Sequence, residues 1–485
     1  MAESSLKDKT AKAASWNIGD KVANYAVSFL IGIVLARLLS PEEYGLIGII
    51  GIFIAIFNLI LDSGLQTALL RKKDVFEKDY CTVFYTNLVL SLLLTFILYF
   101  VAPFLSDFFE RPELTPYTRV MSFVLILNAL SITQQTRLTK KLDFKAQTKI
   151  SIIAHLVSGV IGIVMAFSGM GVWALVAQHM TSRFMTTLLL WINNKWIPKL
   201  IFSIKSFKEL FGFGWKILVA TIIGEVWNQL YQTVIGKCYN PATLGYYTRA
   251  KQYSSLFSSA IGDVVLKVSL PALSTIQDDD AHVISAYKQI IKVVMFITFI
   301  LMLGMAACSK SLIYVLIGEK WMPSVPIMQI ICFYLMLYPL HMININMLTL
   351  QGRSDIQLYL QIIKIGIATI PLILGIFVGI YWMLWGSVLT GIISFFLNSY
   401  YSGKKYRYSS FDQLKDLAPS FGVSCAMAIP VYALSFLTLN PFILLPIQLV
   451  VGFGIVILLC EKTHLDEYEQ AKELILNIIS KLKLI

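Results

Sequence analysis

Residues 15–45 read SWNIGDKVANYAVSFLIGIVLARLLSPEEYG, a stretch that is long enough to cross a bilayer yet contains charged and amide side chains. At about 100° of rotation per residue, these polar side chains share one face of a helix. They are Asn17, Asp20, Lys21, Asn24 and Ser28. An ionised group facing lipid costs roughly 3 kcal/mol or more. The stretch therefore predicts a membrane-spanning helix whose polar face meets other helices or water.

The composition extends this prediction to the whole chain. Of the 485 residues, 57% are hydrophobic and only 14% are charged, whereas charged residues make up about 25% of an average soluble domain. The mean hydropathy is +0.72. Because one span needs about 20 apolar residues, we expect an all-α, polytopic membrane protein with about fourteen transmembrane helices. The expected spans lie within 16–39, 44–69, 81–103, 117–136, 148–168, 171–192, 211–235, 244–268, 286–308, 326–349, 358–378, 380–401, 417–437 and 441–460.

The basic residues of the connecting segments predict the orientation. If fourteen spans alternate in direction, most of the 40 Lys and Arg residues lie in segments on the side of the N-terminus. The segments on the other side contain only Arg111, Lys237, Lys310 and Lys320. Positively charged segments stay in the cytoplasm, so we expect both termini there. The net charge of +12 is then mostly a topological signal, and we expect no nucleic-acid partner.

One of the basic segments is also amphipathic. Residues 137–149, RLTKKLDFKAQTK, place five cations beside Leu138, Leu142 and Phe144. This pattern is typical of an interfacial segment near anionic lipid. We interpret it as a passive anchor rather than a substrate-recognition element. The tail from Leu465 has a similar apolar side and is expected to lie along the cytoplasmic face of the membrane.

The sequence contains an internal repeat. The stretch LLSPEEYGL around Pro41 matches CYNPATLGYY around Pro241, so that proline and glycine recur at the same offset 200 residues later. Six spans separate the copies, an even number, so both copies enter the membrane in the same direction. We expect two six-helix lobes, residues 1–200 and 201–403, followed by two further spans and the tail in 404–485.

Ionisable groups inside the expected spans carry an excess of positive charge, since Lys and Arg residues outnumber Asp and Glu residues by more than two to one. In the eighth span, Arg249, Asp263 and Lys267 share one face, and in the second span Asn58, Asp62 and Gln66 follow each other at intervals of four. A cationic interior favours an anionic cargo such as a phosphate or diphosphate. Three alternatives stay open: cations at span ends reach headgroups, acid–base neighbours form structural ion pairs, and amides hold helices together.

Motifs of other functional classes are absent from the sequence. It has no P-loop, no HExxH motif and no CxxC spacing among its six cysteines. We therefore expect no enzyme activity, no cofactor and no metal site. Transport would then depend on an ion gradient or on a downhill cargo.

Several stretches resemble a known family, the bacterial oligosaccharide flippases of the Wzx type. This family belongs to the polysaccharide-transporter branch of the multidrug/oligosaccharidyl-lipid/polysaccharide exporter superfamily. The resemblance rests mainly on LARLLSPEEYGLIGIIGIF at 35–53, DSGLQTALLRKKD at 62–74 and LGYYTRAKQ at 244–252. It implies that the protein flips an undecaprenyl-diphosphate-linked oligosaccharide across the bacterial inner membrane by alternating access, for surface polysaccharide synthesis. It also implies a monomer that uses H⁺ or Na⁺, and it leaves contact with polysaccharide polymerase machinery open.

On this hypothesis the polar in-span residues divide into three roles. Three cations hold the diphosphate: Lys21, Arg249 and Lys267. Three amides meet the sugars: Asn24, Asn228 and Gln229. Four acids are candidates for ion coupling: Asp20, Asp62, Glu225 and Asp263. The alternatives are a proton- or sodium-coupled multidrug exporter of the same superfamily, which would rest on the acids alone, and a membrane scaffold without transport activity.

Overall fold

The structure is a computed structural model that describes residues 26–62, 64–470 and 472–473, with the side chains at 216, 217, 220, 263, 264, 267, 268, 271 and 272 left out. By their contacts, the residues fall into two compact units, Met1–Gly245 and Tyr246–Ile485. Every regular element in the described part is helical. The all-α prediction is confirmed for this part of the chain.

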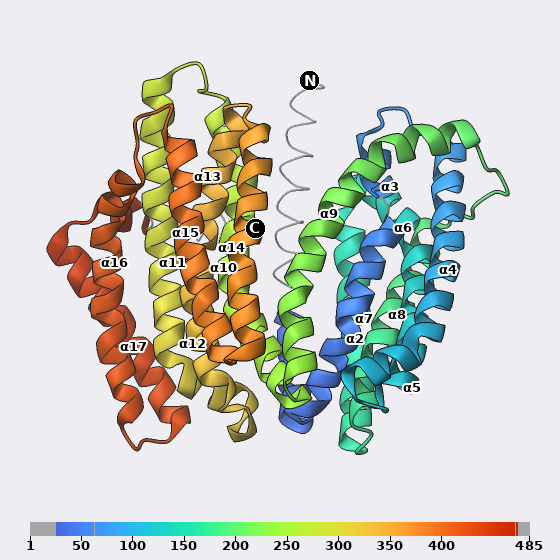
Figure 1. Ribbon diagram of the computed structural model, residues 1–485, viewed down its shortest axis with the longest axis horizontal. Coiled ribbons are helices and arrows are strands. Elements are labelled where there is room, and N and C mark those ends of the chain that lie inside the picture. The colour runs from blue at the N-terminus through green and yellow to red at the C-terminus, as the bar shows by residue number, and fades with distance from the viewer. Residues whose placement is uncertain (1–25, 63, 471, 474–485) are drawn as a thin grey trace. The chain divides into compact units, whose positions relative to one another are not determined.

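In the described part of unit 1, a helix over Ala26–Leu38 precedes eight further helices, and the long ones among these run side by side (Figure 1). They are α2 (Pro41–Asp62), α3 (Leu65–Arg71), α4 (Glu77–Phe109), α5 (Leu114–Ser122), α6 (Val124–Lys140), α7 (Phe144–Phe167), α8 (Val172–Asn194) and α9 (Ile204–Cys238). Helix α7 packs along α8, and α2 packs against α9. Helix α10 (Pro241–Ser274) begins in unit 1 and continues into unit 2.

Unit 2 contains the remaining helices, and α11 packs along α16 while α14 packs along α15. They are α11 (Asp280–Ile317), η1 (Glu319–Trp321), α12 (Ser324–Leu335), α13 (Tyr338–Leu350), α14 (Ser354–Phe377), α15 (Ile380–Gly403), α16 (Ser410–Ala433), η2 (Leu434–Phe436) and α17 (Pro441–Thr463). The start of the predicted tail packs onto α11, where Lys292 and Glu467 form an ion pair at 3.6 Å.

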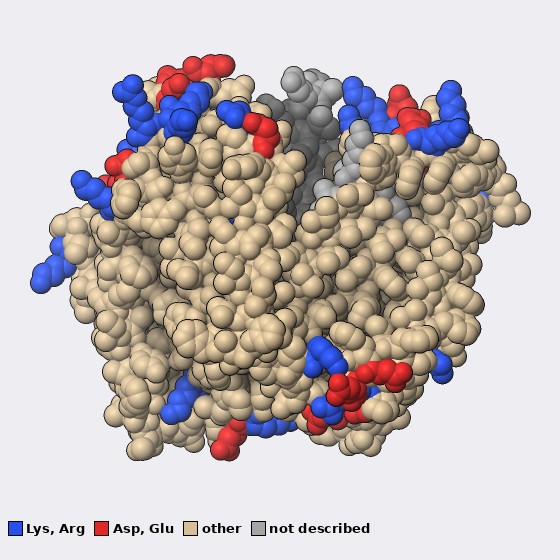
Figure 2. Space-filling model, in the orientation of Figure 1, with Lys and Arg blue, Asp and Glu red and all other residues tan. Residues whose placement is uncertain are grey.

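Nine helical segments of the described residues are long and apolar enough to cross a membrane. They are α2, α4, α7, α11, α12 with α13, α14, α15, α16 with η2, and α17. Large apolar side chains project outward from them, such as Phe104, which is 70% exposed. Figure 2 shows the charged side chains gathered at the two ends of the helices, with an uncharged band between them. The multi-pass membrane class is thereby supported, while the count of fourteen stays a prediction because α8, α9 and α10 are long but too polar to qualify.

The repeated Pro–Gly motif forms the first turns of α2 and α10. Ser40 and Glu43 cap α2 through bonds in both directions, with Ser40 N donating to Glu43 Oε2 at 2.6 Å and Glu43 N donating to Ser40 Oγ at 3.3 Å. Asn240 caps α10, because its Oδ1 accepts from the backbone N–H of Thr243 at 2.8 Å. Proline in the first turn costs no helical hydrogen bond. The cap and the proline thus explain why both helices begin where they do.

The glycines of the same motif permit a reciprocal contact within unit 1. A Cβ atom on Gly45 would overlap the carbonyl oxygen of Pro241, and one on Gly245 would overlap the carbonyl oxygen of Pro41. Only glycine lets two backbones approach this closely. The two copies of the motif therefore pack against each other, each copy's glycine against the other's proline.

Later elements correspond in the same order. Helices α7 and α14 both have 24 residues, and each follows a pair of shorter helices, α5 with α6 and α12 with α13. The fourth and tenth predicted spans are thus each divided, at Phe123 and at Met336–Leu337. The lobe boundaries after residues 200 and 403 stay predictions. The two compact units meet after Gly245, but units defined by contacts need not end where a sequence repeat ends.

The second predicted span, 44–69, is not one helix. Helix α2 ends at Asp62 and α3 begins at Leu65, so Gln66 does not continue the row of Asn58 and Asp62 as expected. Gly64 has a φ of 66° and lies against the backbone of Gly214 in α9, where a Cβ atom would clash. The spacing of four residues predicted that Asn58, Asp62 and Gln66 lie in one row. This prediction was wrong because local spacing contains no information about the contact between Gly64 and Gly214.

Candidate functional site

Helix α9 carries a ladder of polar side chains along one face. The Gln229 amide donates to Glu225 Oε1 at 2.5 Å, and the Gln232 amide donates to Gln229 Oε1 at 2.8 Å. All three side chains are half-buried. Since a hydrogen bond to a charged group is shorter and stronger than a neutral one, the ladder holds the Glu225 carboxylate in a fixed position. These three side chains therefore lie on one face, whereas Asn228 of the same helix is exposed.

The end of α2 supplies a second polar group in unit 1. Asn58 accepts a hydrogen bond from the Asn128 amide of α6 at 2.6 Å, so this amide joins two helices. One turn later, Asp62 Oδ1 is buried and has no hydrogen-bond partner among the described residues. Buried acceptors almost always have partners, so an oxygen without one is a candidate for binding an ion or a proton.

In unit 2, helix α10 carries Arg249, which is half-buried and lies one turn before Tyr253. A serine of the same helix, Ser258, binds another helix instead. The Ser258 hydroxyl is fully buried and donates to the carbonyl of Leu335, the last residue of α12, at 2.8 Å. Ser258 therefore joins two helices, and the Arg249 guanidinium is the group of this face whose side chain is described.

Five of the ten predicted site residues have described side chains. Asp62, Glu225, Asn228 and Gln229 belong to unit 1, and Arg249 belongs to unit 2. Asp20, Lys21 and Asn24 lie outside the described residues, and the side chains of Asp263 and Lys267 lie outside the described side chains. Their assignments stay predictions.

A polar cluster in unit 2 includes a residue that sequence reasoning missed. Lys364 Nζ of α14 donates to Asn398 Oδ1 of α15 at 3.2 Å, and the Asn398 amide lies 3.3 Å from His341 Nδ1 of α13. The sequence draws attention to Lys364 and His341, but not to Asn398. A buried asparagine in an apolar span is the signal that could have found it, because such an amide needs partners inside the bilayer.

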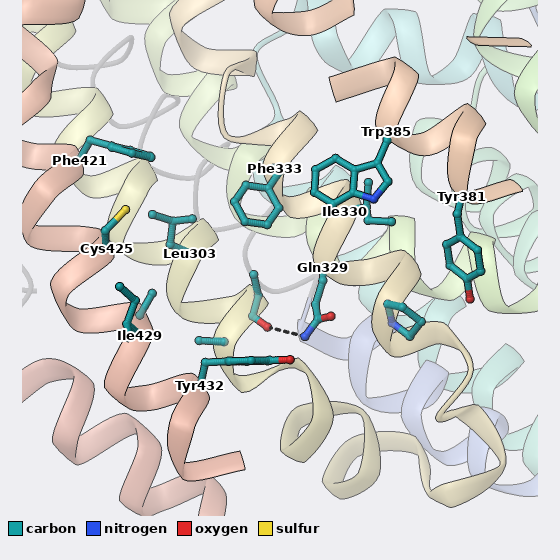
Figure 3. Close-up of a pocket in the computed structure, with 14 residues that line it drawn as sticks. Leu303, Gln329, Ile330, Phe333, Tyr381, Trp385, Phe421, Cys425, Ile429 and Tyr432 are labelled. Carbon is teal, nitrogen blue, oxygen red and sulfur yellow. Dashed lines mark hydrogen bonds between the residues drawn. The ribbon is translucent and has the colours of Figure 1, made fainter. Parts of the chain in front are cut away.

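A cavity of about 580 Å³ in unit 2 has a different character. It lies among α11, α12, α15 and α16, and aromatic or aliphatic side chains such as Phe333, Trp385 and Phe421 form its walls (Figure 3). Gln329 is its main polar group, and the Gln329 amide donates to the carbonyl of Ala306 at 3.4 Å (Figure 3). This cavity can accept a hydrocarbon group but offers no charge to a phosphate. Within the described residues, no three His, Cys, Asp or Glu side chains come together to hold a metal ion.

The sequence and the fold are similar to those of several known proteins. The pattern of the family described as "Polysaccharide biosynthesis protein" matches residues 34–326. The teichuronic acid biosynthesis protein TuaB of Bacillus subtilis is 23% identical over 62% of this chain and 63% of its own length. The succinoglycan biosynthesis transport protein ExoT of Rhizobium meliloti is 22% identical over 65% of this chain and 64% of its own. Both matches span less than two thirds of the relative.

A third relative, the lipopolysaccharide biosynthesis protein WzxC of Escherichia coli, is 23% identical over 74% of both chains. Among solved structures, the lipid II flippase MurJ in an inward closed conformation superposes with a TM-score of 0.72 and 17% identity, covering 92% of this chain and 99% of MurJ. An inward-facing multidrug resistance transporter of the MATE family superposes with a TM-score of 0.58 and 16% identity, covering 79% and 94%. Because the family pattern covers more than half of the sequence, this multi-pass membrane protein belongs to the polysaccharide biosynthesis protein family, with a fold shared by MurJ and the MATE transporters.

Proposed function

We propose that this protein flips an undecaprenyl-diphosphate-linked oligosaccharide from the cytoplasmic to the periplasmic face of the bacterial inner membrane, for surface polysaccharide synthesis. The observation that carries the proposal is the set of polar side chains on α9 and α10 in a chain of this family. A guanidinium, Arg249, lies in α10, and an amide–carboxylate ladder around Gln229 lies in α9. Guanidinium groups bind phosphate in a bidentate manner, and amides both donate to and accept from sugar hydroxyls.

The residue roles follow from this chemistry. Arg249, together with Lys21 and Lys267, binds the diphosphate. The amides of Asn24, Asn228 and Gln229 contact the sugars. The acids Asp20, Asp62, Glu225 and Asp263 are the candidates for coupling to H⁺ or Na⁺, and Asp62 is favoured by its buried Oδ1, which has no hydrogen-bond partner in the described part of the chain. Two lobes of six helices around the substrate, in a monomer with both termini in the cytoplasm, complete the proposal.

The test is complementation of a flippase-deficient strain that accumulates a defined lipid-linked glycan. We expect the wild-type chain to restore surface polysaccharide. We expect Arg249→Ala to reduce restoration at least tenfold, because an ion pair with phosphate inside the membrane is worth more than one at the surface. Arg249→Lys keeps the charge and should retain part of the activity.

Membrane abundance must be equal in all strains, as measured by immunoblotting of the membrane fraction. If Arg249→Ala restores polysaccharide as well as the wild type does, Arg249 does not bind the diphosphate. The multidrug-exporter alternative makes the opposite prediction. Cells would then extrude cationic drugs, and the extrusion would survive Arg249→Ala but not Glu225→Gln.

A further inference from the structure

A small basic pocket lies at one end of unit 1, where α3 joins α4 and α6 joins α7. It encloses about 240 Å³ and is lined by Lys73, Val75, Tyr80, Arg137, Lys140 and Lys141. Lys and Arg side chains gather over this end of the unit (Figure 2). The pocket belongs to the amphipathic segment 137–149 and the preceding loop, and it contains none of the residues assigned to the transport substrate.

Arg137 is held in this pocket by two aromatic rings and by an ion pair with Glu77, but its Nη1 atom makes no hydrogen bond with a described residue. Its guanidinium lies over the rings of Tyr80 and Trp196, at 5.0 Å and 4.7 Å from their centroids, and is 17% exposed. Its closest acid is Glu77, at 3.8 Å, which is too far for a hydrogen bond. The Nη1 atom is buried and has no acceptor among the described residues. Because a guanidinium has five N–H donors, the site has donors available for a ligand with several oxygens.

Two lysines shape the loop that closes the pocket. Lys140 Nζ donates to the carbonyl of Leu69, at 3.1 Å, and to that of Lys72, which ties the end of α3 to α6. Lys72 in turn pairs with Asp79 at 3.3 Å and with Glu209 at 3.0 Å. Burial opposes charge on Lys72, but its bonds to Glu209 and Asp79 outweigh this effect and raise the pKa of Lys72. Lys72 therefore neutralises Asp79 and Glu209, while the exposed Asp74 of the same loop acts electrostatically on Lys140.

The remaining cations stay available. Lys73 and Lys141 are exposed, and no described residue forms an ion pair or a side-chain hydrogen bond with either of them. They face the same pocket as Arg137. A rigid guanidinium beside two unpaired ammonium groups is suited to a phosphate, which accepts several charge-assisted hydrogen bonds.

The surroundings of the pocket indicate a membrane source for this phosphate. Phe76 in the α3–α4 loop is 59% exposed and Leu142 in the α6–α7 loop is 46% exposed, so each of the two loops presents an apolar side chain beside the cations. Both loops lie directly at the ends of membrane helices. Apolar side chains next to basic ones at this depth are typical of contact with acyl chains and headgroups together.

We propose that this pocket binds the phosphate headgroup of an anionic phospholipid, with Arg137, Lys73 and Lys141 as its ligands and Phe76 and Leu142 against its acyl chains. The lipid would bridge the α3–α4 loop and the α6–α7 loop. Lipid binding in this pocket is independent of the transport reaction. Lipid binding can therefore be disproved while the proposed function holds, and the proposed function can be disproved while lipid binding holds.

The test measures binding of defined lipids to the purified full-length protein. Phosphatidylglycerol and phosphatidylcholine with identical acyl chains are titrated, and the bound lipid is counted by native mass spectrometry while the unfolding temperature is followed. We expect phosphatidylglycerol, but not phosphatidylcholine, to bind and to raise the unfolding temperature. The double variant Lys73→Gln/Lys141→Gln should weaken this binding about tenfold or more, since each basic residue near an anionic lipid surface contributes about fivefold.

The control variant Lys205→Gln/Lys208→Gln removes the same charge from exposed lysines of α9 in the same unit, outside the pocket. It should bind phosphatidylglycerol as the wild type does. Equal weakening in the control, equal binding of phosphatidylcholine, or unchanged binding by Lys73→Gln/Lys141→Gln would each overturn the proposal. An equal effect of inorganic phosphate alone would overturn the lipid as its source.

Arg137 needs a separate variant because its ring contacts also support the fold. Arg137→Lys retains the charge but loses the planar donor pattern. We expect weaker phosphatidylglycerol binding and a smaller lipid-induced rise in unfolding temperature. A purely structural arginine would instead lower the unfolding temperature of the lipid-free protein and leave the lipid-induced rise intact, which would contradict its role as a ligand.

Discussion

At the scale of single residues, the membrane helices contain two kinds of polar group. Glu225 and Gln229 satisfy each other, and Asn58 satisfies Asn128. Asp62 Oδ1 has no such partner within the described residues. A buried polar group without a hydrogen bond destabilises the fold by about 1–3 kcal/mol, so its presence indicates a role other than stability.

This contrast makes a prediction for Asp62→Asn. The amide has nearly the same shape but carries no charge to bury, so the unfolding temperature should stay equal or rise. If Asp62 couples transport to an ion, flipping in the variant should become independent of the H⁺ or Na⁺ gradient imposed on vesicles. A lower unfolding temperature together with unchanged ion dependence would show that Asp62 is structural.

At the scale of elements, the clearest feature is the contact between the first turns of α2 and α10. Each turn has a capping side chain, a proline at its start and a glycine four residues later. The cap and the proline act within one turn, whereas the glycine acts on the other copy. The repeat is therefore both a local signal for helix initiation and a packing motif.

We predict that Gly45→Ala and Gly245→Ala each destabilise the protein, by about 1–3 kcal/mol, since a methyl group would overlap a carbonyl oxygen. Chemical denaturation in detergent would measure the effect. Because both glycines serve one contact, the double variant should cost less than the sum of the single variants.

Gly51 of α2 is the matched control, since a Cβ atom there would meet no other atom within 4 Å. Gly51→Ala should leave the stability unchanged or raise it by up to about 1 kcal/mol, because alanine favours the helix. Equal losses at Gly45 and Gly51 would mean that the reciprocal contact does not decide the stability.

At the scale of the whole molecule, the distribution of basic residues predicts the orientation in the membrane. The same rule places the end of α9 on the periplasmic side, where Cys238 is exposed. Of the other five cysteines, four are buried and Cys425 is half-buried in the apolar cavity of unit 2. A charged thiol reagent should therefore reach one native cysteine.

We predict that a membrane-impermeant maleimide labels the wild-type protein in spheroplasts and that Cys238→Ser abolishes the labelling. In the Cys238→Ser background, Lys404→Cys between α15 and α16 should react only after the membrane is permeabilised. The reverse pattern would invert the orientation and place both termini in the periplasm.

The sequence predicted the fold class and the division between α14 and α15 at Gly379. These features depend on composition and on periodicity within one helix. It did not predict the break between α2 and α3, because that break depends on Gly64 lying against Gly214, 150 positions later. For the same reason, Asn398 as the partner of Lys364 and His341 could not be read from spacing.

By itself, then, the sequence determined that the chain is a helical membrane protein, where α2 and α10 begin, and which side chains share a face, because caps, prolines and helical periodicity act over a few residues. Only the tertiary structure decided which of these groups are satisfied. It paired Gly45 with Pro241, left Asp62 Oδ1 without a partner among the described residues, and placed the Arg137 guanidinium over the rings of Tyr80 and Trp196. Such outcomes depend on helices far apart in the chain, whose close approach is fixed by packing rather than by any local pattern.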